Sequence, residues 1–304
     1  MSIKKLHNYK IKLHQLVDYT EMGNVTRIRY MLHRNNSCNI KRLNADNYIY
    51  LPTGEVKEFQ HISDRSQCLK SVERSLRCLR ELLNTNVVDV KKCRWITLTY
   101  AENMTDSKRL YSDYVLFWKR FKYWCNKNGY GKPEYIIACE PQSRGAWHIH
   151  AVFIFEQKAP YIENSVLRTL WGQGFVKIKK LDDVDNVGAY LTAYLGDMSL
   201  DEYKEDKPKS IWVGDVKEIE VEQNGEKIKK KYLKGARLFM YPPKFNLFRY
   251  SRGIRKPVTE VMTYKKAKEK ASAATLTFSN AVQFSSGEFE NTIATEFYNS
   301  ARKH

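Results

Sequence analysis

The chain has 304 residues, 42% of them hydrophobic, which is enough for one sizeable core and an accessory region. Its formal net charge of +18 favours a polyanionic partner, most simply nucleic acid, although a solvated basic surface has the same composition. The six cysteines lack the spacing of a zinc cluster or disulfide framework, and no leader or apolar run of ~20 residues is present. We therefore expect a cytoplasmic protein that is neither secreted nor embedded in a membrane.

Residues 1–90 are polar and basic and contain one strongly periodic segment, from Ser63 to Asn86. Its apolar residues recur at helical spacing, and basic residues occupy its other faces, which predicts an amphipathic helix. Such a helix either packs on the core with a wet basic face or contacts DNA directly. We interpret residues 1–90 as a basic N-terminal accessory region.

A regular order of strands and helices is predicted from Lys91 onward. The expected elements are a strand at 93–100, a helix at 110–128, strands at 134–140 and 146–155, a helix at 162–171, a strand at 174–179 and a helix at 185–195. The order β-α-β-β-α-β favours an α+β fold, a ferredoxin-like split βαβ antiparallel sheet with helices on one face and added N- and C-terminal segments. The aromatic stripe of the first helix is interpreted as core packing: Tyr114, Phe117, Trp118, Phe121 and Trp124.

The remainder of the chain is predicted to be less regular. The hydrophilic sequence around Asn224 and Gly225 indicates loops or an exposed hairpin. The Ala/Ser/Thr/Lys-rich end is expected to form a helix followed by a weakly ordered tail. These patterns divide the chain into an accessory region at 1–90, a main domain at 91–260 and a C-terminal helix and tail at 261–304.

Two histidines one residue apart interrupt the apolar strand RGAWHIHAVFIF. Residues i and i+2 of a strand share a face, so His148 and His150 present their imidazoles side by side. Glu140 ends the preceding strand, and a short turn brings its carboxylate beside them. Two imidazoles and a carboxylate can hold Mg²⁺ or Mn²⁺, with Zn²⁺ as a competitor. The alternatives are an accidental histidine pair and an ordinary charge at the end of a strand.

Tyr190 and Tyr194 are four residues apart on a predicted helix, so their hydroxyls share a face. A tyrosine hydroxyl beside a metal-polarised phosphate can attack phosphorus as a covalent nucleophile. The alternative for this pair is an ordinary core stripe.

Three motifs in order, WITLTYAEN, EPQSRGAWHIHAVFIF and VGAYLTAYLGD, resemble those of the HUH endonucleases, and more narrowly the rolling-circle replication initiators of plasmids, integrative elements and small phages. The resemblance covers about Arg65 to Glu260. It implies that Thr97 and Thr99 lie in the first-motif strand beside the site, and that the metal ligands are Glu140, His148 and His150. It also implies that Tyr190 is the primary nucleophile and that Tyr194 performs a second transfer.

The third motif departs from the family pattern, which usually has lysines three and seven residues after the first tyrosine. Here these positions are Ala193 and Asp197. Lys177 and Lys179 on the neighbouring strand could substitute for the lysines, or Asp197 could be a further metal ligand.

The resemblance predicts site-specific nicking of origin DNA, single-stranded or extruded as a hairpin, through a 5′-phosphotyrosyl intermediate and a free 3′-OH. A host helicase and polymerase are the expected partners, because no Walker-type sequence is present. Candidate phosphate contacts are Arg144, Lys177, Lys179, Arg249, Arg252 and Arg255, although the arginines after residue 248 could equally lie in a solvated loop. Alternatives are a relaxase or transposase with the same chemistry, or a non-catalytic nucleic-acid-binding module.

Overall fold

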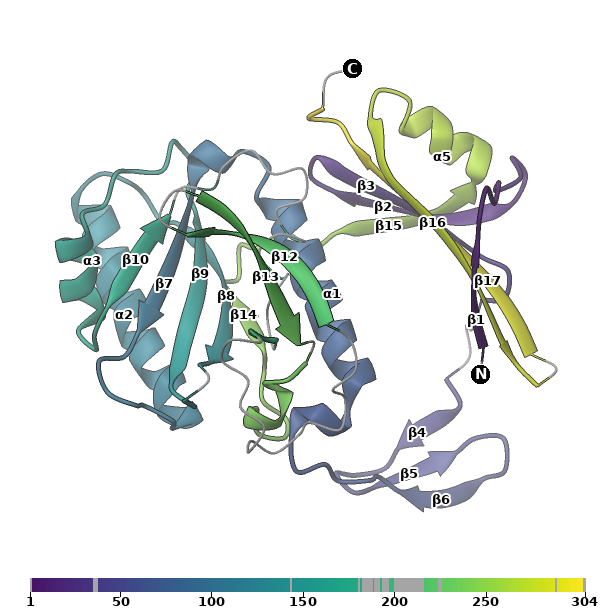
Figure 1. Ribbon diagram of the computed structural model, residues 1–304, viewed down its shortest axis with the longest axis horizontal. Coiled ribbons are helices and arrows are strands. Elements are labelled where there is room, and N and C mark those ends of the chain that lie inside the picture. Colours follow the sequence, from purple (N-terminus) through teal and green to yellow (C-terminus); the bar gives the residue numbers. More distant parts are fainter. Residues whose placement is uncertain are drawn as a thin grey trace. The chain divides into compact units, whose positions relative to one another are not determined.

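The chain forms two compact units, which are described separately (Figure 1). The computed structural model describes residues 2–34, 38–142, 144–179, 181, 188, 192, 197–199, 216–223, 226–233, 235–287 and 289–302. Unit 1 combines Met1–Glu21, Thr26–Ser63 and Thr259–His304, and unit 2 combines Met22–Val25 with Asp64–Val258. Segments from both ends of the chain thus share one unit. The division into functional regions at 1–90, 91–260 and 261–304 stays a prediction.

The centre of unit 2 is a five-stranded sheet in the order β10-β7-β9-β8-β14. Every neighbouring pair in it is antiparallel. Its strands are β7 (Cys93–Thr99), β8 (Glu134–Pro141), β9 (Trp147–Ile154), β10 (Val176–Lys179) and β14 (Phe248–Tyr250). The mixed α and β composition with antiparallel sheets agrees with the expected class, and the first four of these strands occur where the sequence predicts them.

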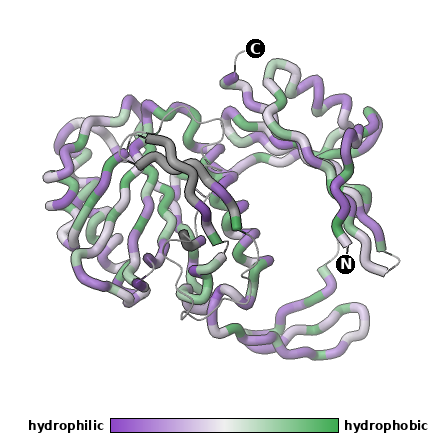
Figure 2. The backbone as a smooth tube through the Cα atoms, viewed as in Figure 1, coloured by the Kyte–Doolittle hydropathy of each residue, from purple (hydrophilic) through white to green (hydrophobic). Residues whose placement is uncertain are grey.

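Helices cover both faces of this sheet. Alternation along β9 directs Ile149, Ala151 and Phe153 into a core shared with α2 (Ser107–Lys127) and α3 (Asn164–Trp171). The opposite face carries Ala138 and Val152, which pack against leucines of α1 (Leu69–Asn86). Figure 2 shows the hydrophobic residues that run along the central strands. The expectation that the helices lie on one face is therefore wrong, because α1 has a leucine stripe that this second face buries.

The helix α2 begins where the local sequence satisfies its first backbone donors. The Asp106 carboxylate accepts hydrogen bonds from the backbone N–H groups of Lys108 and Arg109. The predicted aromatic stripe is confirmed as core at Tyr114, Phe117 and Phe121, which are buried. Trp118 and Trp124 are partly exposed and pack against that core.

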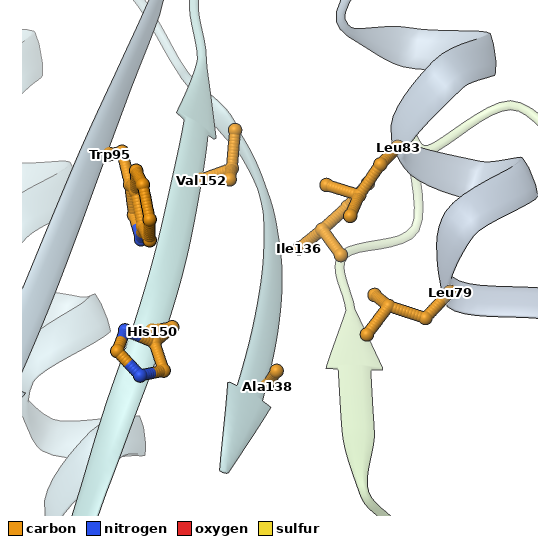
Figure 3. A pocket seen from close by; sticks show the side chains of 7 residues that line it. All are labelled: Leu79, Leu83, Trp95, Ile136, Ala138, His150 and Val152. Atoms are coloured by element: carbon orange, nitrogen blue, oxygen red, sulfur yellow. The ribbon is translucent and has the colours of Figure 1, made fainter. Parts of the chain in front are cut away.

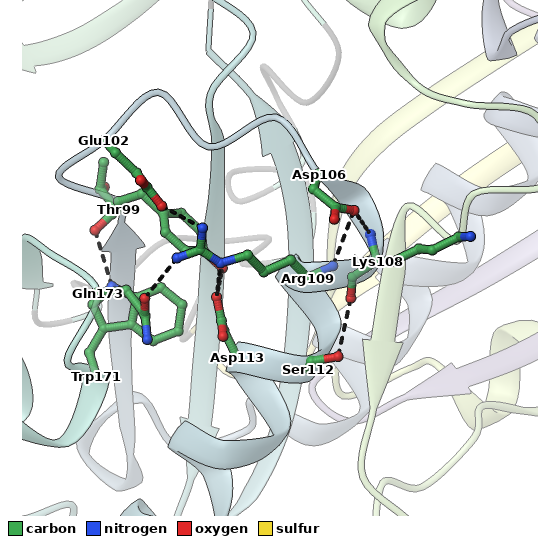
Figure 4. Close-up of polar contacts among 10 residues, drawn as sticks. Thr99, Glu102, Asp106, Lys108, Arg109, Ser112, Asp113, Trp171 and Gln173 are labelled. Carbon is green, nitrogen blue, oxygen red and sulfur yellow. Dashed lines mark hydrogen bonds and ion pairs between the residues drawn. The ribbon is translucent and has the colours of Figure 1, made fainter.

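A polar network holds the end of β7 (Figure 4). The Arg109 guanidinium contacts the carboxylates of Glu102 and Asp113 at 2.6 and 3.3 Å and donates to the Gln173 side chain at 3.2 Å. The Trp171 indole N–H donates to the Thr99 carbonyl at 3.1 Å. Because these residues come from β7, α2, α3 and the loops between them, the network fixes the position of the last residues of β7.

A second sheet of unit 2 has three strands, in the order β11-β13-β12. It comprises β11 (Met198–Ser199), β12 (Val216–Gln223) and β13 (Glu226–Leu233). Gln223 pairs with Glu226, so β12 and β13 form a hairpin with a two-residue connection. This confirms the predicted hairpin alternative, and its turn residues, Asn224 and Gly225, lie outside the described residues. Short 3₁₀ helices are also present at Arg65–Gln67, Val90–Lys92 and Leu238–Met240.

Unit 1 is built on a six-stranded sheet in the order β1-β16-β17-β3-β2-β15. Its elements are β1 (Ser2–Leu6), β2 (Leu16–Met22), β3 (Val25–Met31), β15 (Val258–Thr263), α5 (Tyr264–Lys270), β16 (Thr275–Ser286) and β17 (Phe289–Asn299). Val17, Ile28 and Ala267 are fully buried in its core. A second sheet consists of β4 (Ile40–Arg42), β5 (Asn47–Tyr50) and β6 (Glu55–Glu58), whose described residues are all at least partly exposed.

The end of the chain differs from the expectation. The predicted helix exists as α5, but the weakly ordered tail is wrong, because β16 and β17 pair with each other over nearly their whole length. The Ala/Ser/Thr composition suggested disorder, yet both strands also contain β-branched and aromatic residues, which suit a partly buried sheet. Their other neighbours, β1 and β3, come from the start of the chain, so the pairing that orders them is not local.

Candidate metal centre

The register of three strands brings the predicted ligands together. Glu140 on β8 lies directly opposite His148 on β9, and Thr97 and Thr99 on β7 lie opposite His150 and His148. Directly paired residues of an antiparallel sheet share a face. The sequence argument that His148 and His150 share a face, with Glu140 near them, is therefore confirmed.

The ligand atoms converge. The Nε2 atoms of His148 and His150 are 2.8 Å apart and lie 3.4 and 3.3 Å from Glu140 Oε2. These are three donors of the kinds that bind divalent cations, and they form the only such group found among the described residues. The Thr97 hydroxyl lies 3.2 Å from His150 Nδ1, on the far side of the ring, where a partner orients a ligating imidazole. The arrangement fits a metal ion.

Arg237 is a site residue that sequence reasoning missed. Its Nη1 lies 2.9 Å from Glu140 Oε1, so this oxygen pairs with a guanidinium while Oε2 faces the imidazoles. Glu140 is 5% exposed, and the Arg237 side chain is 11% exposed. No sequence signal pointed to Arg237, because it reaches Glu140 only through tertiary contact between segments 97 residues apart.

The electrostatics favour the protonation states that bind metals. Burial raises the pKa of the Glu140 carboxyl, but hydrogen bonds from His148 and His150 and the charge of Arg237 outweigh it and hold that pKa well below its usual range. Burial, with the charge of His150, lowers the pKa of the His148 imidazole. An ionised carboxylate and a neutral imidazole are the forms that ligate a cation.

Three of the candidate phosphate contacts lie near the three candidate metal ligands in the fold: two on β10 and one in the turn between β8 and β9. Lys177 is exposed and pairs with Thr97, so it shares a row and a face with His150. The Lys179 ammonium lies 5.9 Å from the Trp95 ring, two residues further along the same face. Arg144 is exposed in the turn that joins β8 to β9.

The arginines on and after β14 do not cluster around Glu140, His148 and His150, which we call the metal group. Arg249 pairs with Ile137, one residue out of phase with Ala138 and therefore on the opposite face, and its guanidinium lies 3.4 Å from the Tyr111 ring centroid. Arg252 is exposed. The Arg255 backbone is held by the Asn86 side chain, and its guanidinium donates to the Thr85 carbonyl at 3.4 Å.

The predicted nucleophiles, Tyr190 and Tyr194, lie outside the described residues, and their assignment stays a prediction. Asp197 is buried, and its carboxylate accepts a hydrogen bond from the Gly235 backbone N–H at 2.7 Å. It is not a member of the metal group found in the described part of the chain.

An apolar pocket adjoins the metal group (Figure 3). It lies between α1 and the sheet face that carries His150, and its lining residues are Leu79, Leu83, Trp95, Ile136, Ala138, His150 and Val152. The pocket places α1 directly beside a strand that carries two of the predicted ligands.

Comparisons with known proteins agree with this geometry in one segment. A family model of replication-associated proteins, described by the name ORF2, matches residues 93–199, about a third of the chain. No curated protein and no solved structure matches significantly. Within the described ranges, no helix has both the length and the apolar character needed to cross a membrane. The matched segment contains β7 to β10 and all three members of the metal group, so this part of the chain is similar to replication-associated proteins and is consistent with a replication initiator.

Proposed function

We propose that the chain is a rolling-circle replication initiator of the HUH type, which nicks single-stranded origin DNA and later rejoins it. The observation that carries the proposal is the convergence of Glu140, His148 and His150 on one face of the sheet, inside the segment that resembles replication-associated proteins. Binding to origin DNA agrees with the net charge of +18.

The order of strands supports the HUH assignment. β7 and β8 are both antiparallel to β9, which lies between them, and α2 connects them. A βαβ unit split by a third strand, with β10 on the outer side of β7, is the arrangement of a ferredoxin-like sheet. In this proposal the sheet is a rigid support for the metal ligands, and α1 is an addition on the ligand face.

Glu140, His148 and His150 would hold Mg²⁺ or Mn²⁺, which supplies Lewis-acid polarisation of the scissile phosphate. Arg237 keeps Glu140 ionised, and Thr97 orients the His150 ring. The Tyr190 hydroxyl attacks phosphorus, so a phosphotyrosyl bond forms while the bond from phosphorus to the 3′ oxygen breaks. The phenol proton passes to solvent, and the departing 3′ oxygen takes up a proton to become the free 3′-OH.

The phosphodiester energy is retained in the covalent link, so rejoining requires no nucleotide hydrolysis. In the proposal Tyr194 performs the second transfer at termination. Arg144 and Lys177, which are exposed beside or in line with the ligands, contact the DNA backbone. Lys179, on the same face as Lys177, extends this contact surface. Arg249, Arg252 and Arg255 would contact the DNA elsewhere, because Arg249 lies on the opposite face of the sheet. A host helicase and polymerase act on the product in the cytoplasm.

The test is formation of a covalent protein–DNA adduct. Single-stranded oligonucleotides that tile the replicon encoding the chain, labelled on the 5′ or 3′ side, are incubated with protein and Mn²⁺ and separated under denaturing conditions. We expect an adduct that carries the 3′ label, disappears in Tyr190→Phe and persists in Tyr194→Phe. Tyr161→Phe is the matched control, since Tyr161 is 81% exposed and lies outside the site.

Other outcomes separate the alternatives. Loss of the adduct in Tyr194→Phe but not in Tyr190→Phe would reverse the assignment of the two tyrosines. DNA binding without an adduct for any oligonucleotide would favour a non-catalytic module, and an adduct only with transfer-origin or transposon-end DNA would favour a relaxase or transposase.

A further inference from the structure

The helix α1 is firmly attached to the strands that carry the metal ligands. Leu79, Leu82 and Leu83 are at most 2% exposed and pack in the same cluster as Ala138 and Val152. Ala138 pairs directly with His150. Figure 3 shows the leucines of α1 facing this part of the sheet, with His150 nearby. Because close-packed side chains move little relative to one another, α1 and the ligand strands form one rigid support.

The last turns of α1 hold Gly188 by a direct backbone contact. Asn84 is 5% exposed, and its side-chain oxygen accepts a hydrogen bond from the Gly188 N–H at 2.8 Å. A Cβ atom at Gly188 would lie 2.4 Å from the Arg80 carbonyl oxygen and 2.9 Å from Asn84 Oδ1. Only glycine therefore permits this approach to the helix.

A second anchor lies four residues further along. The Arg80 Nε donates to the Thr192 hydroxyl at 3.3 Å, and that hydroxyl donates to the Gly188 carbonyl at 2.7 Å. Thr192 N–H donates to the same carbonyl at 3.2 Å. Arg80 and Asn84 are four residues apart and share a face of α1, so one face of the helix holds both Gly188 and Thr192.

We propose that Asn84 and Arg80 are positioning residues, and that α1 is the platform that fixes the nucleophile-bearing segment relative to the metal ligands. Tyr190 is two residues from each anchored position in the sequence. The inference rests on the proposed function, since it assigns a purpose to Gly188 and Thr192 only if Tyr190 is the nucleophile. The inference also changes the interpretation of the amphipathic helix α1. Its polar face then binds Gly188 and Thr192 through Asn84 and Arg80 and is not only a solvated surface.

The consequence of such a platform is a rate effect without an affinity effect. Asn84 is buried, bonds to the Gly188 N–H and is not one of the three candidate metal ligands, so its loss should leave metal and DNA binding intact. Misplacement of a reacting group by about 1 Å lowers a rate by on the order of 10²-fold. A residue with a merely structural role would instead lower stability and leave the rate of the folded fraction unchanged.

The test compares Asn84→Leu with Asn84→Asp in the full-length chain. Leucine has a similar volume but removes the acceptor for the Gly188 N–H, whereas aspartate keeps an oxygen at that position. Thr85→Val is the matched control, because its hydroxyl bonds within α1, to the Glu81 carbonyl, and not to Gly188. The single-turnover rate of adduct formation is measured at saturating oligonucleotide and Mn²⁺, and DNA affinity is measured separately in chelator.

We expect the saturated rate of Asn84→Leu to fall by on the order of 10²-fold, with DNA and Mn²⁺ affinities within about twofold of the wild type. Asn84→Asp should recover most of the rate, and Thr85→Val should retain it. A saturated rate in Asn84→Leu equal to that of the wild type would overturn the inference. If Asn84→Leu does not fold, Gly188→Ala takes its place, because it disrupts the same contact without changing α1. The same measurements then apply, with the same expected loss of rate.

Hydrogen exchange tests the contact independently of activity. The Gly188 amide should be protected in the wild type and in Thr85→Val, and it should exchange faster in Asn84→Leu. Equal exchange in all three would overturn the platform even if the rates differ. A wild type that forms no adduct would overturn the proposed function and the catalytic part of the inference, while the exchange data would still report on the docking of Gly188 to α1.

Discussion

Replacement of Arg237 by methionine tests the electrostatics of the proposed metal centre most directly. The Glu140 carboxylate is 5% exposed, and its Oε1 is 2.9 Å from the Arg237 guanidinium. Arg237→Met removes this partner while keeping most of the side-chain volume, so it leaves a buried carboxylate with only the two imidazoles beside it. Breaking a buried ion pair from one side is expected to lower the free energy of unfolding by about 3–5 kcal/mol.

For a unit of this size, each 1 kcal/mol corresponds to about 2–4 °C in Tm. The metal-free Tm of Arg237→Met should therefore fall by roughly 6–20 °C. A divalent cation then supplies the positive charge that the variant lacks, so Mn²⁺ should raise the Tm of Arg237→Met more than that of the wild type.

The assay is thermal unfolding with chelator and with a Mn²⁺ titration. Lys57→Met is the control, because Lys57 and Glu55 form a solvent-exposed pair, 45% and 61% accessible, which solvent screens and which should contribute little to stability. A chelated Tm for Arg237→Met within about 2 °C of the wild type, or the same Mn²⁺ effect in both, would refute the proposed role of Arg237.

Three further predictions follow from the same geometry. Thr97→Val removes the hydroxyl beside His150 Nδ1 and should weaken Mn²⁺ binding by about 10–100-fold in calorimetry, whereas Thr97→Ser should not. Because burial lowers the pKa of His148 in the folded chain, the unfolded state takes up a proton first as pH falls below about 6.5. The metal-free unfolding free energy should therefore decrease with falling pH in denaturant titrations, with a smaller slope in His148→Gln, and an unchanged slope would contradict this reasoning. Gly174→Ala would place a Cβ atom 2.3 Å from the Ala101 backbone nitrogen, whereas a Cβ atom at Gly129 has no neighbour within 4 Å. The Tm of Gly174→Ala should therefore be well below that of Gly129→Ala. Equal Tm values would show that the backbone around Gly174 moves easily to accept the methyl group.

Local patterns were sufficient for much of unit 2. The alternation of polar and apolar residues in β9 predicted which side chains share a face, because the period of a strand is a property of the backbone. A short polar turn between β8 and β9 then placed Glu140 beside the histidines, since a hairpin of that length pairs its ends in register. The stripe of Tyr114, Phe117 and Phe121 predicted the buried side of α2 for the same kind of reason.

Long-range pairing was not predictable from those patterns. The strands β16 and β17 are ordered partly by β1 and β3, from the opposite end of the chain, and their small residues gave no strong apolar signal. The position of α1 also escaped the sequence argument. Its amphipathic pattern predicted a buried stripe but not which face of the sheet would bury it.

The clustering of Glu140, His148 and His150 is thus a consequence of the amino-acid sequence alone, because strand alternation and one short turn bring them together. The environment of that set was decided by tertiary structure. Arg237 pairs with Glu140, and Asn84 holds Gly188, across separations of about one hundred residues. The periodicity of a sequence predicts only which side chains share a face of a strand or helix. Which other segment packs against that face depends on how the whole chain buries its apolar surface.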